Sequence, residues 1–417
     1  MRDELRGVSI GLALSLSIVD CGSGLDRGTL PQQLSDAAFW TLLTSVSEVP
    51  GTFSHSDNLV SNEMRLPHTV RLLHARGGVY IGVGPEQNFS YIARIQPAMA
   101  FIIDIRQENR NLHLLYKALF ELSADRLDLV SRLFSRERPA PLNGDDSAHA
   151  LFEAYHTARP SAELLANTTA AVRDRLLATH RWPLSAAELE SIDDALLAFY
   201  TDGPAIAYRP VRPMHERQPS YRELMTATDF SGYGRSYLAS EEAFQFVKEQ
   251  HAKNLIVPVV GDFASSEGAI ARVGDYARRH GSRVSAFYAS NVQVYLNNQQ
   301  MIVFCRNLAA LPVSKHRSVF IHNEGPQPFR DKLAWCGLRT DVDVPGMDWL
   351  RNAERKGFDA ANDSAPKARE GWRRERDSNP WYGFPYTRFP SVLLQPLGHL
   401  SVRLATLAHG EPYEQNQ

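Results

Sequence analysis

Apolar residues in the central part of the chain follow two patterns, short continuous runs and helical repeats. The continuous runs lie at 79–83, 100–105, 255–260, 283–288 and 318–322. Runs of this length, rich in β-branched and aromatic residues, are typical of strands buried on both faces of a parallel sheet. Between them apolar residues recur at helical spacing, as at 112–120 and 298–309. This alternation predicts an α/β fold with a Rossmann-like, doubly wound and mainly parallel sheet.

A mainly helical insertion interrupts the sheet pattern after its second strand–helix unit. Helical patterns occupy about 147–157, 161–180 and 185–200, and a stretch rich in proline and tyrosine follows to about 236. A weak edge strand is expected at 340–344. We predict five segments: an N-terminal segment 1–34, the first half of the sheet domain 35–138, a helical insertion or cap 139–245, the second half 246–350, and an irregular tail 351–417.

The two ends of the chain differ from this pattern. Residues 8–19 form an apolar run of signal-peptide length, shorter than a membrane span, after a charge-balanced start. We favour a cytoplasmic protein, with export or a lipid anchor from residues 8–21 as the alternative. From about 367 to 417 the chain resembles a translated transfer-RNA gene, and a Pro/Arg-rich interaction tail is the other interpretation. In both cases we expect this tail to lie outside the fold.

Charge and cysteine content narrow the function classes. The 45 Lys+Arg and 47 Asp+Glu residues give a formal net charge of −2, which is no nucleic-acid signature. Apart from residues 8–19, no segment is a candidate to cross a membrane. Cys21, Cys305 and Cys336 form no Cys-x-x-Cys pair, which excludes a disulfide scaffold and a Cys-based zinc site. A metal held by His and carboxylates stays open, although no His-Glu-x-x-His string occurs and we assign no metal ligands.

A glycine-containing turn follows the first apolar run, and an acid ends the second. Gly82 and Gly84 allow a sharp bend and a close approach of a ligand to the main chain. Asp104 lies 20 residues after Gly84 and can accept hydrogen bonds from ribose hydroxyls. Open α/β sheets bind ligands at such strand ends, so the pair predicts a nucleoside site. An ordinary turn beside a solvated Asp is the alternative.

The details of this turn favour S-adenosylmethionine among the nucleosides. Gln87 stands where the dinucleotide pattern has its third glycine, which disfavours NAD and FAD, and no P-loop string follows. S-adenosylmethionine has no phosphate to bind. At the tip of the third run, Asp262 is expected to accept from the adenine amino group while Phe263 packs on the ring. The remaining expected cofactor-binding residues are Glu86, Gln87, Asn88 and Arg106.

Four strings carry a resemblance to known families. Residues 79–91, 102–106, 113–125 and 287–292 resemble an uncharacterised bacterial family described as methyltransferase-like, and the motif order is similar to class I S-adenosylmethionine-dependent methyltransferases. The resemblance covers about residues 35–325 and implies methyl transfer to a small-molecule or macromolecular acceptor that it does not identify. Tyr80 stands where such enzymes commonly have an acid, and Glu86 replaces the last glycine. Either Glu86 contacts the cofactor's amino group in place of the missing acid, or this contact is absent.

Three groups of residues are candidates for the acceptor side. Ser290 and Asn291 follow the fourth run, where a polar residue would face the methyl group, and Asp57 is a third catalytic candidate. Asn58, Ser61, Asn62 and Glu63 form a predicted lid over the cofactor. Tyr233 belongs to a predicted glycine-hinged substrate loop.

Each of these assignments has a structural alternative. Asp57 and Ser61 are suitable helix caps, and Ser290–Asn291 suits a plain turn. His113, beside an apolar run, suits a hydrogen-bonded core histidine, and Arg106 suits a solvated helix face. For the whole chain the alternative is a catalytically inactive Rossmann-like protein that binds a nucleoside or a partner.

Overall fold

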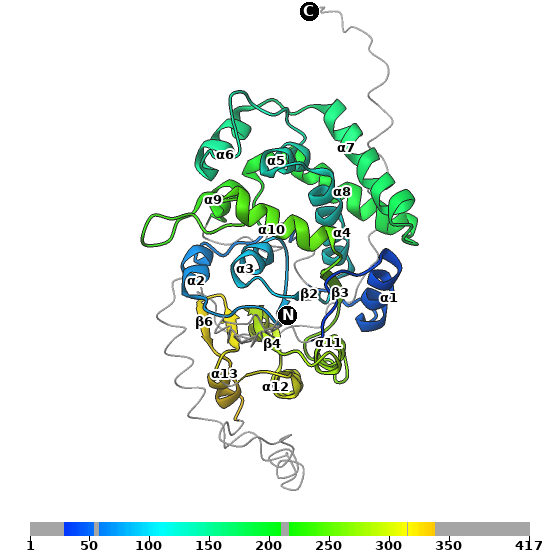
Figure 1. The fold of residues 1–417 in the computed structure, drawn as a ribbon, viewed down its shortest axis with the longest axis vertical. Helices are drawn as coiled ribbons and strands as arrows, with labels where there is room; N and C mark the ends of the chain where they lie inside the picture. The colour runs from blue at the N-terminus through cyan, green and yellow to red at the C-terminus, as the bar shows by residue number, and fades with distance from the viewer. Residues whose placement is uncertain (1–28, 54–57, 210–216, 315, 338–417) are drawn as a thin grey trace, which may run out of the picture. The chain divides into compact units, whose positions relative to one another are not determined.

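The structure is a computed structural model that describes residues 29–53, 58–209, 217–314 and 316–337. These residues form an α/β fold with one six-stranded, mostly parallel sheet and thirteen α-helices (Figure 1). The predicted edge strand at 340–344, the apolar run 8–19, Asp57 and the tail 367–417 lie outside the described residues.

Five strands of the sheet coincide with the five apolar runs. The strands are β1 (Val79–Gly82), β2 (Met99–Asp104), β3 (Ile256–Val260), β4 (Val284–Ser290), β5 (Val319–His322) and β6 (Gly325–Pro328). Their order across the sheet is β3-β2-β1-β4-β5-β6, with parallel pairs up to β5 and an antiparallel β6. The sequence did not predict β6 because Pro326 and Pro328 cannot donate to a ladder. They are accommodated because β6 is an edge strand of the described sheet.

The strand order reverses next to β1. From β1 the chain adds β2 and then β3 on one side, and it returns to place β4 on the other side of β1. Every residue of β1, β2 and β3 is buried, as expected for strands covered on both faces. The carboxyl ends of β1 and β4 therefore lie side by side at the point where the connections separate.

Helices cover the two faces of the sheet. In Figure 1, α3 (Gln87–Ile95), α4 (Gln107–Leu122) and α10 (Glu241–Ala252) lie above the sheet, and α11 (Ala269–Arg279), α12 (Asn298–Ala310) and α13 (Phe329–Trp335) lie below it. Two further helices, α1 (Asp36–Val46) and α2 (Leu66–Leu72), precede the first strand. The core is continuous from the sheet into these layers.

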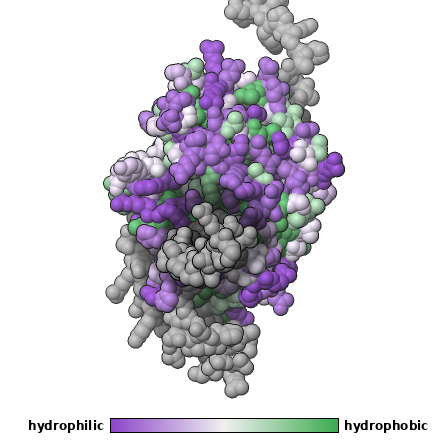
Figure 2. All heavy atoms as spheres, in the orientation of Figure 1, coloured by the Kyte–Doolittle hydropathy of each residue, from purple (hydrophilic) through white to green (hydrophobic). Residues whose placement is uncertain are grey.

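All regular elements between β2 and β3 are helical. Besides α4 and α10 they are α5 (Arg126–Phe134), α6 (Ala148–Thr157), α7 (Ala162–Asp174), the π-turn η1 (Arg175–Thr179), α8 (Ala186–Asp202), the 3-10 turn η2 (Gly203–Ala205) and α9 (Tyr221–Thr226). Serine side chains accept an N–H at the starts of α6, α7, α8 and α9, which fixes where these helices begin. Figure 2 shows a mostly hydrophilic surface over this helical part, in the upper half of the view.

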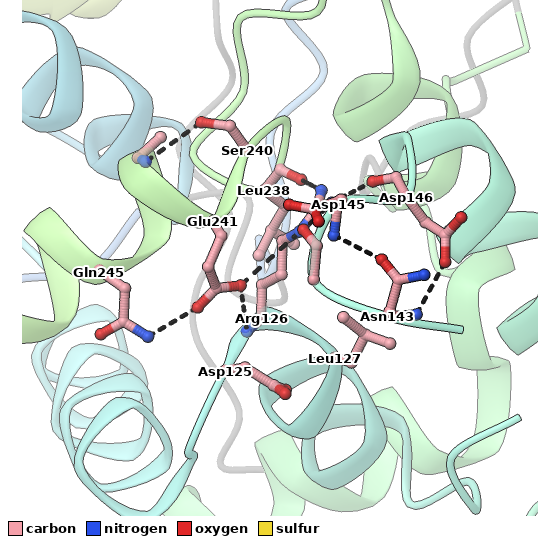
Figure 3. A network of polar contacts seen from close by, with 12 residues as sticks. Asp125, Arg126, Leu127, Asn143, Asp145, Asp146, Leu238, Ser240, Glu241 and Gln245 are labelled. Atoms are coloured by element: carbon pink, nitrogen blue, oxygen red, sulfur yellow. Dashed lines mark hydrogen bonds and ion pairs between the residues drawn. The ribbon is translucent and has the colours of Figure 1, made fainter. Parts of the chain in front are cut away.

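The buried guanidinium of Arg126 connects three parts of the helical region (Figure 3). It donates to the carbonyl oxygens of Leu238 at 2.7 Å and Gly144 at 2.9 Å, and also to that of Asp146. The backbone N–H of Arg126 donates to Glu241 Oε2 at 3.2 Å. One side chain at the start of α5 therefore fixes both the loop before α6 and the entry to α10.

A disulfide joins Cys305 in α12 to Cys336 at the end of α13, with 5.7 Å between the α-carbons. The sequence excluded a disulfide scaffold and did not predict this bond, because a separation of 31 residues forms no local motif. Among the described helices, none has the length and apolar character needed to span a bilayer.

The Arg126 network yields a stability prediction. Arg126→Ala should lower the free energy of unfolding by about 3 kcal/mol, because buried carbonyl oxygens lose their donor. Arg132→Ala is the matched control: that side chain lies in the same helix, is 27% exposed and pairs with Asp128 one turn away. Arg132→Ala should lower the free energy of unfolding by at most about 0.5 kcal/mol. Urea denaturation of both variants tests this, and equal losses would contradict the role of Arg126.

Candidate functional site

Polar side chains gather where β1 and β4 end. The Tyr288 hydroxyl donates to Glu63 Oε1 at 2.7 Å, and the Ser290 hydroxyl donates to the same oxygen. Gln87 Nε2 donates to the Tyr288 hydroxyl oxygen at 2.8 Å. We call Glu63, Glu86, Gln87, Tyr288 and Ser290 the carboxyl-edge cluster. It joins a predicted lid residue, two predicted cofactor residues and a predicted catalytic residue.

Ser61 links the two acids of this cluster. Its backbone N–H donates to both carboxylate oxygens of Glu86, at 3.1 and 3.3 Å. Its hydroxyl accepts from the backbone N–H of Glu63 at 3.1 Å. The segment that precedes α2 thus lies against the start of α3, and a lid role for Ser61 and Glu63 stays a prediction.

Both acids hold protons more tightly than ordinary carboxyl groups. Burial raises the pKa of Glu86 to about 7, partly opposed by the Ser61 N–H, and nearby Glu63 raises it further. Burial also raises the pKa of Glu63, opposed by the hydrogen bonds from Ser290 and Tyr288. No described cation is among the groups that shift either pKa. Perturbed carboxyl groups of this kind are typical of functional sites.

The backbone at the end of β4 directs Ser290 toward the cluster. Ser290 has a φ of 48°, in the left-handed region that residues other than glycine seldom adopt. The register between β4 and β5 shifts between Tyr288 and Ser290. Asn291 follows directly, with its Oδ1 at 3.5 Å from the Ser290 hydroxyl. Ser290 and Asn291 therefore form the predicted local turn, and the Ser290 side chain contacts Glu63 as well.

The glycine turn is filled on its inner side. Asn88 Nδ2 donates to the carbonyl oxygens of Val83, Gly84 and Pro85, at 2.9, 3.1 and 2.7 Å. The Tyr80 hydroxyl donates to Asn88 Oδ1 at 2.8 Å. A Cβ at Gly82 would overlap with both of these side chains, so Gly82 is needed to pack the turn itself.

At Gly84, which is buried, the space where a side chain would begin is largely empty. This residue has a φ of 77°, and a Cβ built there meets only Gln87 Nε2, at 3.5 Å. His113 Nε2 lies 2.9 Å from the Gly84 carbonyl oxygen, and burial lowers the pKa of His113 to about 4. His113 is therefore neutral and donates through Nε2, which makes it a core histidine that holds the turn.

Asp104 ends β2 and pairs with Arg106. Its Oδ1 accepts from the Arg106 backbone N–H at 3.0 Å and from Nε at 2.9 Å, and its Oδ2 accepts from Nη2 at 2.9 Å. Both side chains are buried, at 7% and 5% exposure. A carboxylate has about four acceptor positions, so Oδ2 can accept one more hydrogen bond while the pair persists.

The end of β3 forms an Asx turn. Asp262 Oδ1 accepts from the Ala264 N–H at 2.8 Å. Phe263 is buried in the core, with its ring centroid 5.5 Å from that of Phe287 and 6.0 Å from that of Phe304. A ligand ring on Phe263 stays a prediction that requires this packing to open.

The remaining predicted residues lie around the cluster. Asn62 Nδ2 donates to Gln218 Oε1 at 3.0 Å, which ties the predicted lid to the helical region. Asn58 has a buried side-chain oxygen without a described partner. Tyr233 is 64% exposed at a turn, where it contacts Asp229 and Arg235. These contacts do not bring Tyr233 to the cluster.

Sequence reasoning missed Tyr288 and Tyr91. Tyr91 is fully buried, its hydroxyl has no described partner, and its ring centroid lies 4.8 Å from that of Tyr288. Tyr288 was included only in an apolar strand run. A tyrosine two residues before a predicted polar strand end was the available signal, since a buried hydroxyl seeks a polar partner.

The family model described as "Domain of unknown function (DUF7790)" matches residues 58–188 and 207–329, more than half of the chain. The chain belongs to this family. The DUF7790 match includes Ser61, both acids of the cluster, Asp104 and Ser290. No curated protein matches the chain.

The pKa of Glu86 predicts a pH-dependent difference in stability. Between pH 4.5 and 7 the folded chain keeps a proton on Glu86 that the unfolded chain has lost, so this group's contribution to stability falls as pH rises. Glu86→Gln does not titrate. The free energy of unfolding of the variant, relative to that of the unaltered protein, should therefore rise by about 3 kcal/mol from pH 4.5 to pH 8.

Urea denaturation at both pH values measures this gain. Glu108→Gln, on the exposed surface of α4, is the control and should show a constant difference from the unaltered protein. A Glu86→Gln difference that is the same at both pH values would contradict the assigned pKa.

Proposed function

We propose that this protein is an S-adenosylmethionine-dependent methyltransferase of the class I type, with a Rossmann-like, doubly wound sheet. The observation that carries the proposal is the reversal of strand order between β1 and β4 beside the Gly84 turn and Asp104. Open α/β sheets bind their ligands at such a reversal, outside the carboxyl ends of the strands.

The residues present have free capacity for such a cofactor. Gly84 has no side chain to block an approach to the main chain, and Asp104 Oδ2 can accept a hydrogen bond from a ribose hydroxyl. Asp262 would accept from the adenine amino group through its remaining acceptor positions.

The cofactor supplies, when bound, a methyl group activated on a sulfonium. This chain's residues have to orient the acceptor, exclude water and take up a proton where the acceptor must lose one. Glu86, with a pKa of about 7, suits proton uptake near neutral pH. Ser290 and Glu63 at the end of β4 would position the acceptor.

A second function is favoured by the Asp104–Arg106 pair. In this arrangement Arg106 donates three hydrogen bonds to the carboxylate to which ribose hydroxyls would otherwise donate. Asn88 likewise occupies the inner side of the turn. These contacts support a non-catalytic Rossmann-like protein that binds a nucleoside weakly or binds a partner.

Calorimetric titration with S-adenosylhomocysteine separates the two functions. We expect S-adenosylhomocysteine to bind the full chain, with an affinity weakened about fivefold to 150-fold by Asp104→Asn, which corresponds to about 1–3 kcal/mol of binding free energy. The amide keeps an oxygen for Arg106, so the pair is disturbed less than by alanine. Asp275→Asn, on the exposed surface of α11, should bind as the unaltered chain does.

Absence of binding at millimolar ligand would remove the methyltransferase proposal. Binding without methyl transfer to any member of a broad acceptor panel would support the second function. Unchanged affinity in Asp104→Asn would show that this carboxylate does not hold the ribose.

A further inference from the structure

The carboxyl-edge cluster contains two acids without a described cationic partner. Glu86 accepts from the Ser61 amide, and Glu63 accepts from the hydroxyls of Tyr288 and Ser290. All three donors are neutral. Burying an uncompensated negative charge is costly, and a cation that arrives with a ligand would offset this cost.

The cluster also has more acceptors than donors. Gln87 uses its Nε2 to donate to Tyr288, while its buried Oε1 has no partner in the described part of the chain. Glu63 Oε2 accepts no hydrogen bond from a described residue, whereas Oε1 accepts two. A complementary ligand must therefore bring hydrogen-bond donors as well as positive charge.

Aromatic rings adjoin these acceptors. Tyr288 donates to Glu63, and the Tyr91 ring lies 4.8 Å from the Tyr288 ring, centroid to centroid. Aromatic faces attract ligand cations. Within the described residues, no three His, Cys, Asp or Glu side chains gather to hold a metal ion. An organic cation with N–H donors is the better match than a metal.

We propose that Glu63, Gln87 and Tyr288 bind the ammonium group of an amine ligand. Three N–H donors of a primary ammonium can be shared between Glu63 Oε2 and Gln87 Oε1. Glu63, Ser290 and Asn291 are partly exposed, so the group is approached from the β4 side. This site goes beyond methyl transfer and does not depend on it.

The amine is a ligand separate from the nucleoside. Asp104 ends β2, and Tyr288 lies in β4, with β1 between them. Adjacent strands lie about 4.8 Å apart, so the two strand ends are separated by about 10 Å. If the proposed function holds as well, the amine is the class of methyl acceptor that this site selects.

Two probes of nearly equal shape test the ammonium site. 4-Fluorobenzylammonium and the neutral 4-fluorobenzyl alcohol are titrated against the full chain at pH 8 and followed by fluorine NMR. We expect the ammonium to bind at least about tenfold more tightly, because charge and N–H donors distinguish it. Equal affinities would overturn the proposal, and this comparison needs no variant to fold.

Matched variants assign the preference to Glu63. Glu63→Gln should abolish the preference for the ammonium, and the exposed Glu108→Gln should keep it. A preference that survives in Glu63→Gln would overturn the assignment.

Repeating the titration with S-adenosylhomocysteine present separates this proposal from the proposed function. If the ammonium probe binds with unchanged or higher affinity, the amine and the nucleoside occupy separate sites side by side. Displacement of the probe would overturn the proposal of two separate sites. If S-adenosylhomocysteine does not bind, the methyltransferase proposal fails while the two-probe comparison remains valid.

Discussion

The hydrogen bond between the Ser61 amide and the buried Glu86 carboxylate anchors the structure around the strand reversal. At the ends of parallel strands, backbone and side-chain polar groups need partners that the sheet itself does not provide. Here Glu86 begins α3, and Ser61 belongs to a segment that precedes β1 by many residues. Removing this contact would leave an acid and an amide unpartnered in the same buried place, where each is costly.

The described parts of the segment before β1, residues 47–53 and 58–63, contact the ends of β3 and β2, the start of α3 and the end of β4 in turn. The Glu48 N–H donates to the Val260 carbonyl oxygen of β3 at 2.8 Å, and the Gly51 N–H donates to Ile105 O, just after β2, at 2.9 Å. Ser61 then contacts Glu86 at the start of α3, and Glu63 contacts the end of β4. The same sheet edge that offers a ligand site is thus partly covered by the chain's own residues.

Glu48 bears on the kind of ligand this edge can take. Its carboxylate accepts from the N–H groups of Asp262 at 3.1 Å and Ala269 at 2.9 Å, at the beginning of α11. The N-terminus of a helix is where open α/β sheets commonly hold phosphate groups. Because an acid of the chain already satisfies these donors, the arrangement favours a ligand without phosphate at β3. This agrees with the preference drawn from the missing third glycine.

Much of the fold followed from local pattern, and the site did so only in part. The apolar runs located β1 to β5 because buried parallel strands are continuously apolar, whereas β6 has prolines that only an edge tolerates. The sequence correctly placed Gly84 in the turn after β1 and Asp104 at the end of β2, while their role in binding a nucleoside stays a prediction. The partners that occupy Asp104 and Gly82, which are Arg106 and Asn88, depend on side-chain packing that spacing does not encode.

The helical region between β2 and β3 packs against α3 beside the cluster. Tyr221 and Tyr237 are fully buried and hydrogen-bonded to each other, and the Tyr237 N–H donates to Ser90 Oγ of α3 at 3.1 Å. By excluding water beside α3, this packing contributes to the burial that raises the pKa of Glu86. A cation held at Glu63 would lower the same pKa. A bound cation would therefore increase the ionised fraction of Glu86 near neutral pH.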